Sequence, residues 1–328
     1  MRPRTLARFT RRISLATVVV TASLATAGDL TPPPGPVAPT MKPLDIVEPR
    51  IPIGPDTTPG DATSVYRITA PGAYYLTENL IGEPGKNGIQ IDAIGEVWID
   101  LNGMTARGVP GSLTGVIASG RVNVTDGFVT LWGDDGVSVG AATIERVTAL
   151  TNGRDGIRAL WGTQINRCAA EANGRDGISV ADVSRIDNCV TKGNGRWGIH
   201  ADGAITIAGC TVYNNTAGGI EIGLAHVTDC MIFSNTVAGV IDRGNSTIKN
   251  NTIHSSPVGI QVLGDTSRIE SNHIVQCNTG IEIQGIDSII IANSVRNSTT
   301  PYNIQPGNQA GAIVTSPVGA GPWDNFTQ

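Results

Sequence analysis

Apolar and polar positions recur along this chain every 20 or 21 residues. A glycine followed by Ile or Val begins each repeat, and these glycines are Gly115, Gly136, Gly156, Gly177, Gly198, Gly219, Gly239, Gly259 and Gly280. A second apolar series keeps the same period and consists of Ile165, Ile186, Ile207, Val227, Ile248, Ile269 and Ile290. A fixed period of this length indicates a solenoid, in which each repeat buries its apolar side by stacking on its neighbours.

Within each repeat, the pattern favours short strands over a helix. The segment from Ile207 to Gly223 contains short β-branched runs that alternate apolar and polar residues, and Gly, Asn, Asp or Thr bounds each run. Such runs are typical of strands separated by turns. We therefore predict an all-β solenoid of roughly nine or ten coils, whose strands pair in parallel at a spacing of ~4.8 Å.

Two polar columns follow the same period. One consists of Asn152, Asn173, Asn194, Asn215 and Asn235, and the other of Cys168, Cys189, Cys210, Cys230, Asn251, Asn272 and Asn293. Stacked amides can hydrogen-bond to one another along the solenoid axis, so we expect both columns to stabilise bends. We expect the cysteines to be buried and reduced, because parallel side chains on neighbouring strands do not suit disulfide geometry. Cys277 lies outside the column and is also expected to be unpaired.

These glycine anchors, the Ile-x-x-Asn/Cys column and the period resemble the right-handed parallel β-helix proteins of the pectin-lyase-like superfamily. The resemblance covers roughly Ile89 to Val295 and implies a single-stranded right-handed parallel β-helix, as in secreted proteins of mostly unassigned activity. A leucine-rich repeat shares the period and the Asn/Cys column. It requires a leucine-dominated consensus, whereas these columns are Ile, Val and Gly, so we reject it.

Composition changes at both ends of the repeats. Residues 1–27 predict a signal peptide, with five arginines, an apolar run and a small-residue cleavage site. The Thr10–Leu15 run resembles a twin-arginine signal, and ordinary secretion is the alternative. Residues 28–60 predict a proline-rich disordered tether, 61–107 an N-terminal cap and first coils, 108–297 the regular β-helix, and 298–328 a C-terminal cap anchored by Trp323 and Phe326.

Charge and hydropathy limit the partners. Signal removal would leave 18 Lys and Arg against 28 acids, a net charge of −10. This charge argues against nucleic acid, which needs a basic surface, and against a polyanion unless a divalent cation bridges the charges. No apolar stretch after the signal approaches the ~18 residues of a membrane span. We expect a protein that is secreted or held in the cell envelope, and its oligomeric state stays open.

Two sets of positions differ from the ordinary polar residues of the outward and turn positions, and they are candidates for glycan binding. Two residues after the anchors, Arg158, His200 and Glu221 point outward, and His200 and Glu221 are expected to be ~5 Å apart on neighbouring coils. One or two residues before the anchors lie an aspartate row and an arginine row, comprising Asp135, Asp155, Asp176, Trp197, Arg154, Arg175 and Arg196. The alternative is a solvated strand face beside ordinary Asn-Gly-Arg-Asp-Gly turns.

Stacked carboxylates repel one another unless arginine or a cation intervenes, so Ca²⁺ is one alternative for the aspartate row. Trp197 at the end of the row is expected to stack on a sugar ring. Asp126, Asp134 and Asp135 resemble the paired aspartates of β-helix polygalacturonases. Asp126 and Asp134 are only eight residues apart, however, and no Gly-His-Gly or Arg-Ile-Lys follows. We therefore assign no catalytic residue, no metal ligand and no other cofactor.

The sequence predicts an exported β-helix that recognises a polysaccharide or cell-envelope glycan along its outer face. The first alternative is a polysaccharide lyase or glycoside hydrolase that uses the aspartate row and neighbouring arginines. The second is a structural surface protein. The regular spacing leaves no room for the long loops that would wall a catalytic groove, which favours binding or structure over catalysis. The glycan rests on the resemblance alone, because fold does not fix function.

Overall fold

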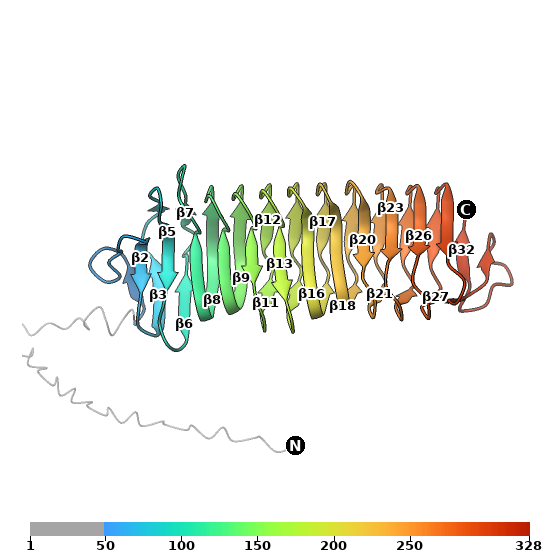
Figure 1. The fold of residues 1–328 in the computed structure, drawn as a ribbon, viewed down its shortest axis with the longest axis horizontal. Helices are drawn as coiled ribbons and strands as arrows, with labels where there is room; N and C mark the ends of the chain where they lie inside the picture. The colour runs from blue at the N-terminus through green and yellow to red at the C-terminus, as the bar shows by residue number, and fades with distance from the viewer. Residues whose placement is uncertain (1–48) are drawn as a thin grey trace, which may run out of the picture. The chain divides into compact units, whose positions relative to one another are not determined.

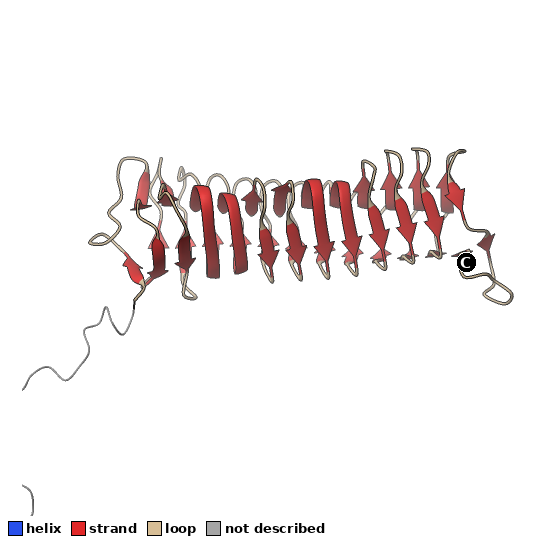
Figure 2. Cartoon of the chain, turned by 90° about the horizontal axis from the view of Figure 1, so that it is seen from below, coloured by secondary structure: helices blue, strands red, loops and turns tan. Residues whose placement is uncertain are grey.

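The computed structural model describes residues 49–328, so the predicted signal peptide and residues 28–48 of the predicted tether lie outside the described residues. The described chain contains 32 strands, and no helix occurs within it (Figure 2). The strands follow one another in chain order along one axis (Figure 1). Within residues 49–328, nothing forms a helix that could cross a membrane.

The strands of each turn lie on three faces of the solenoid. Face 1 consists of β2 (Ser64–Ile68), β5 (Asn87–Ile91), β8 (Val116–Thr130), β9 (Val137–Leu150), β10 (Ile157–Ala159), β13 (Ile178–Ala181), β16 (Trp197–Ala208), β18 (Gly218–Thr228), β20 (Ala238–Asp242), β23 (Val258–Val262), β26 (Thr279–Ile283) and β29 (Thr300–Ile304). The long strands β8 and β9 continue around the bends onto faces 2 and 3, and β16 and β18 continue onto face 2.

Faces 2 and 3 hold the shorter strands. Face 2 adds β1 (Ile51–Ile53), β3 (Gly72–Leu76), β6 (Val97–Asp100), β11 (Gln164–Asn166), β14 (Arg185–Asp187), β21 (Thr247–Lys249), β24 (Arg268–Glu270), β27 (Ile289–Ile291) and β30 (Gln309–Ala310). Face 3 adds β4 (Leu80–Ile81), β7 (Thr105–Arg107), β12 (Ala169–Glu171), β15 (Val190–Lys192), β17 (Thr211–Tyr213), β19 (Met231–Phe233), β22 (Thr252–His254), β25 (His273–Val275), β28 (Ser294–Arg296), β31 (Ile313–Val314) and β32 (Asn325–Thr327).

Parallel pairing between successive turns confirms the predicted fold class. Ile157 pairs with Ile178, and Ile178 with Ile199, so identical side chains stack in columns. These three residues are completely buried, as the solenoid pattern requires. The solenoid has about twelve turns rather than nine or ten. Counting the Gly-Ile and Gly-Val repeats does not reveal the additional turns, for two reasons. The spacing from Gly88 to Gly115 is 27 residues, and β2 and β29 contain no Gly-Ile pair.

The asparagine columns form hydrogen-bonded ladders, as predicted. The side-chain amide of Asn173 donates to Oδ1 of Asn194 at 3.0 Å, and Asn194 donates to Asn215 at 2.9 Å. The anchor glycines lie beside this ladder, because a Cβ on Gly177 would be 2.6 Å from the Asn194 amide nitrogen. The second ladder links Asn251, Asn272, Asn293 and Asn325 in the same way. All five cysteines are buried and free, as expected.

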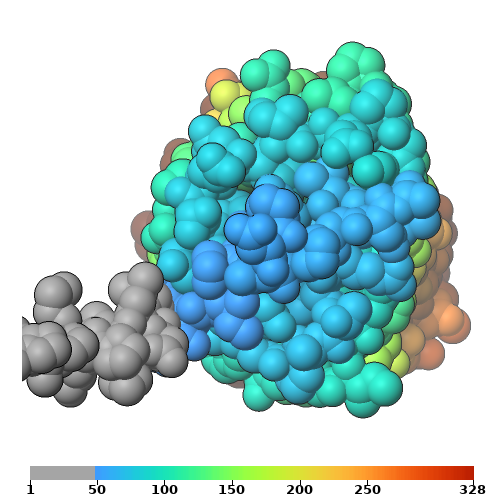
Figure 3. All heavy atoms as spheres, turned by 90° about the vertical axis from the view of Figure 1, so that its left-hand side faces the viewer, coloured from blue at the N-terminus to red at the C-terminus, as the bar shows by residue number. Residues whose placement is uncertain are grey.

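Both ends differ from the predicted boundaries. Ile51–Ile53 pairs with β3, so ordered structure begins before residue 60, where the tether was predicted to end. Residues of the first turns cover the N-terminal end of the solenoid (Figure 3). At the other end, Thr300–Ile304 forms a further rung, and Asn325 extends the second ladder. Trp323 is 59% exposed and therefore does not anchor this cap, contrary to our expectation.

Candidate functional site

The aspartate row lies in the bend between face 3 and face 1. Each carboxylate accepts the backbone N–H of the next member of the row: Asp135 from Asp155 at 3.1 Å, Asp155 from Asp176 at 3.1 Å, and Asp176 from Trp197 at 3.0 Å. The three aspartates are at most 3% exposed. Because the carboxylates lie beneath the surface, they cannot form the open ligand-facing row that the sequence suggested.

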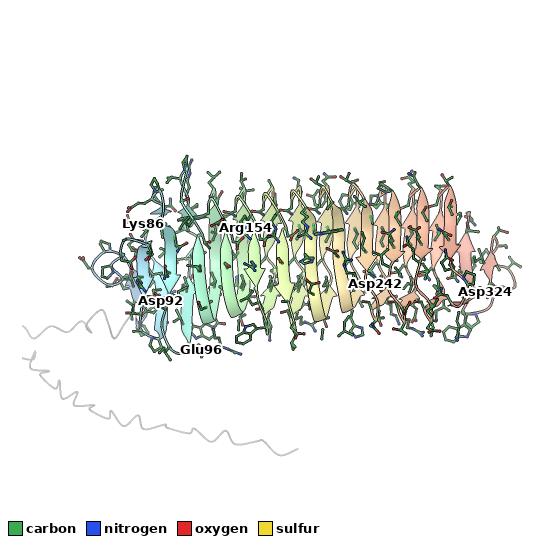
Figure 4. All side chains as sticks on the ribbon, in the orientation of Figure 1. Lys86, Asp92, Glu96, Arg154, Asp242 and Asp324 are labelled. Atoms are coloured by element: carbon green, nitrogen blue, oxygen red, sulfur yellow. The ribbon has the colours of Figure 1, made fainter. Side chains whose placement is uncertain are left out.

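The arginine row lies beside these carboxylates, and two of its three members form ion pairs with them. Arg175 places Nε 3.4 Å from Oδ1 of Asp155 and Nη2 3.4 Å from Oδ2 of Asp176. Arg196 places Nη1 3.5 Å from Oδ2 of Asp176. Arg154 is 3.9 Å from Asp134 (Arg154 is labelled in Figure 4). The side chains of Arg154, Arg175 and Arg196 are 38–43% exposed, and Asp134 beside Arg154 is 42% exposed, so the accessible edge of this bend carries three guanidinium groups and one carboxylate.

Burial governs the electrostatics of the middle aspartate. Removal from water raises the pKa of Asp155, and the neighbouring carboxylates of Asp135 and Asp176 act in the same direction. The Arg175 guanidinium and the backbone N–H of Asp176 lower the pKa without reversing the rise. Oδ2 of Asp155 is buried and has no hydrogen-bond partner. Burial therefore disfavours the charged form of Asp155, and the Arg175 guanidinium above it offsets part of that cost.

Trp197 does not offer its ring to a ligand. Its side chain is buried among small residues, with Ala238 and Ile241 in the same cluster. Gly218, on the next rung, leaves the space for the ring, since a Cβ there would lie 2.2 Å from it. The expectation that Trp197 stacks on a sugar is therefore wrong.

His200 and Glu221 are neighbours on face 1, as predicted. They are paired in register between β16 and β18, and His200 Nε2 lies 3.4 Å from Oε2 of Glu221. Glu221 points outward but is only 2% exposed, because Arg243 Nε donates to its Oε1 at 2.9 Å and Arg196 approaches Oε2 at 3.9 Å. Asp202 lies 3.6 Å from the same histidine nitrogen. Arg196 therefore connects the arginine row to a cluster around Glu221.

The remaining candidates are separated from one another. Arg158 is half-buried in the outward column of face 1, two rungs before His200. Asp126 lies in the bend between faces 2 and 3, where Arg146 binds both its oxygens and lowers its pKa. It therefore cannot work with Asp134 as a carboxylate pair. Among residues 49–328, no three His, Cys, Asp or Glu side chains form a group suited to a metal ion.

Two features of the site are not among the residues predicted from the sequence: the buried carboxylate of Asp242 and the contact of Arg243 with Glu221. Asp242 is completely buried at the end of β20 (labelled in Figure 4), where it accepts from Gly244 N at 2.9 Å and Ser246 Oγ at 2.7 Å. It pairs in register with Ile222 and Val262, two inner residues. An acid in an otherwise apolar column was the available signal. Arg243, the next residue, continues outward and donates to Glu221.

Comparisons with known proteins agree with this architecture. Residues 157–256 match the family model described as the right handed beta helix region. The chain has a right-handed parallel β-helix fold. No curated protein matches the sequence.

Two solved structures resemble this β-helix. The Agl-KA catalytic domain has a TM-score of 0.56 and 13% identity, over 87% of this chain and 64% of that domain. This chain therefore spans slightly less than two thirds of that domain. The A-module of Azotobacter vinelandii mannuronan C-5 epimerase AlgE4 has a TM-score of 0.51 and 20% identity, over 74% of this chain and 91% of that module. At these identities, the likeness concerns the fold alone.

Proposed function

We propose that this protein binds an acidic polysaccharide along the bend between face 3 and face 1. The observation that carries the proposal is the row of Arg154, Arg175 and Arg196. Successive members are joined by backbone hydrogen bonds, from Arg175 N to Arg154 O at 2.9 Å and from Arg196 N to Arg175 O at 2.8 Å. One guanidinium is therefore offered at each rung, about 4.8 Å along the axis.

The accessible groups favour an anionic ligand. The three aspartates of the row are buried, whereas the arginine heads reach solvent, with Asp134 as one exposed carboxylate beside Arg154. Arginine presents a planar fork that suits the two oxygens of a carboxylate or sulfate. The predicted net charge of −10 belongs to the whole secreted chain, while screening confines the attraction between ligand and site to about 10 Å. A short acidic glycan segment can therefore bind without a bridging cation.

The fold and the predicted export agree with such a ligand. One structure of similar fold is an epimerase module whose name gives mannuronan as its polymer. The predicted signal peptide would place the protein where polysaccharides of the cell envelope are accessible. We propose a binding protein rather than an enzyme, because Asp135, Asp155 and Asp176, the aspartates of the row beside the arginines, are buried.

Affinity electrophoresis of residues 28–328 tests the proposal. Gels would contain polygalacturonate, alginate or a neutral glucan, each with Ca²⁺ or with chelator. We expect retardation by an acidic polymer in both conditions, and its loss in Arg154→Gln/Arg175→Gln/Arg196→Gln. The matched control is Arg167→Gln/Arg185→Gln/Arg268→Gln, which changes the same number of exposed arginines on or beside face 2. Equal retardation of the two triple variants would refute the proposal. Retardation only with Ca²⁺ would instead place a bridging cation in the site.

A second candidate function is a polysaccharide lyase or glycoside hydrolase, and the His200–Glu221 pair favours it. The histidine is 18% exposed and lies 3.4 Å from a nearly buried carboxylate. An imidazole held in this way can exchange a proton with a bound substrate. This function predicts unsaturated products or new reducing ends from the same polymers. His200→Gln would abolish product formation and leave retardation on the gel intact, whereas no product from the wild-type protein would exclude the candidate for those polymers.

A further inference from the structure

The outer side of face 3 carries an apolar strip. Tyr213, Phe233 and His254 stack on successive rungs, with ring centroids 4.6 Å and 4.9 Å apart and planes within 12°. Met231, beside Phe233 on β19, is 50% exposed. We define the aromatic strip as Val190, Tyr213, Met231, Phe233, His254 and Val275, all of which retain solvent exposure. Tyr, Phe and Met are enriched at protein interfaces, and a contiguous apolar patch of this kind commonly marks one.

Opposite charges flank the strip at equal distances from its centre. Glu171 lies three rungs before Phe233 in the same outward column, through Lys192 and Tyr213. Arg296 lies three rungs after it, through His254 and Val275. At ~4.8 Å per rung, each charge is about 14 Å from Phe233. Neither Glu171 nor Arg296 makes an ion pair within residues 49–328, and the Arg296 guanidinium donates to the neutral side chain of Gln328.

We propose that a second copy of this chain packs on the aromatic strip with its solenoid axis antiparallel. A two-fold axis that runs along β19 and lies midway between the two copies would bring Phe233 against Phe233. Because this rotation reverses the order of the rungs and preserves each outward column, Glu171 of each copy faces Arg296 of the other. The interface is isologous, as a two-fold dimer requires. This assembly is independent of the glycan site, which lies in the bend next to face 1.

The charge pattern selects this arrangement over a parallel one. Two copies with parallel axes would place Glu171 at the level of Glu171 and Arg296 at the level of Arg296, which is unfavourable. Lys192 does not oppose the antiparallel pairing, because its counterpart is Val275, and its Nζ lies 5.6 Å from the centroid of the Tyr213 ring. Two ion pairs at the ends of the strip therefore set the orientation, and the apolar centre supplies the contact area.

Sedimentation equilibrium of residues 28–328 tests the dimer. We expect a concentration-dependent dimer, weakened at least about tenfold by Phe233→Lys. The control Trp98→Lys changes a more exposed aromatic residue on face 2 and should leave the dimer intact. Circular dichroism would confirm that each variant is folded.

Charge reversal tests the orientation and does not depend on the Phe233 variant. Glu171→Arg and Arg296→Glu should each weaken the dimer about tenfold, and the double variant should restore it to within about threefold. A wild-type protein that stays monomeric up to about 0.5 mM would overturn the proposal. A dimer that is insensitive to Phe233→Lys, or that the double reversal fails to restore, would overturn it as well.

Discussion

Two rows of stacked polar side chains lie three residues apart in the same bend, and they complete their hydrogen bonds differently. In the asparagine ladder, each amide donates to the Oδ1 of the next rung and to a backbone carbonyl, as Asn194 does to Asn215 and to Ala170. In the aspartate row, the carboxylates can only accept. Each takes a backbone N–H from the next rung, and Asp155 keeps an oxygen without a partner.

The two rows therefore differ in what they require from the surface. An amide ladder satisfies itself inside the solenoid and requires nothing from the surface. A carboxylate row retains negative charge beneath the surface, and the guanidinium groups of Arg175 and Arg196 lie over it. The same backbone bend therefore carries an internal amide ladder at one position and partly exposed arginines two residues later.

Placing a carboxylate in the amide ladder should produce the largest effect. Asn194→Asp removes the donor to Asn215 and Ala170 and sets a charged oxygen against Oδ1 of Asn215. We expect the free energy of unfolding to fall by about 3–5 kcal/mol at pH 7. The loss should be smaller at pH 4, where a protonated carboxyl can donate. Urea denaturation followed by circular dichroism at both pH values measures it.

The control for this variant is Asn278→Asp, at an exposed position. It should change the free energy of unfolding by less than about 0.5 kcal/mol. If the two variants lose similar stability at pH 7, the ladder does not depend on amide donors.

Removing one arginine from the aspartate row should have an intermediate effect. Arg175→Gln leaves Asp155 and Asp176 without their shared cation, and we expect a loss of about 1–2 kcal/mol, because the carboxylates are buried and the arginine is partly exposed. Arg185→Gln breaks an ion pair with the more exposed Asp187 and should cost less than about 0.5 kcal/mol. Thermal unfolding of both variants in low salt compares them. Equal losses would mean that the buried row does not need its arginine.

Replacing one aspartate of the row with asparagine should give the smallest change in the free energy of unfolding and the clearest pH dependence. Burial raises the folded-state pKa of Asp155, so the folded protein binds this proton more tightly than the unfolded chain does. The stability contributed by this group is therefore present at low pH and is lost as pH rises through its folded pKa. Asp155→Asn removes that loss.

We expect Asp155→Asn to melt about 2 °C above the wild-type protein at pH 7 and at nearly the same temperature at pH 3. Differential scanning calorimetry across this range measures the gap. A gap that narrows or reverses as the pH rises would show that Arg175 outweighs the burial of Asp155.

The repeat columns could be predicted because each column repeats one environment. Ile165 and Asn194 each occupy the same environment as the equivalent residues on other rungs. Side-chain burial at the site could not be predicted in this way. Trp197 is covered because Gly218 and Ala238 leave room for its ring, and Glu221 is covered because Arg243 extends over it. Both outcomes depend on particular neighbours on the following rungs rather than on the column itself. The pairing of Glu171 with Arg296 between two copies can be inferred only once their equal distance from Phe233 is known.

The most direct test of the arginine row is calorimetric titration of residues 28–328 with an acidic oligosaccharide of the class that retards the protein on the gel, at low and high salt. We predict binding that weakens as salt rises, and that Arg154→Gln/Arg175→Gln/Arg196→Gln abolishes while its melting temperature remains high enough for a folded protein at the assay temperature. Unchanged affinity in this folded triple variant would contradict the account.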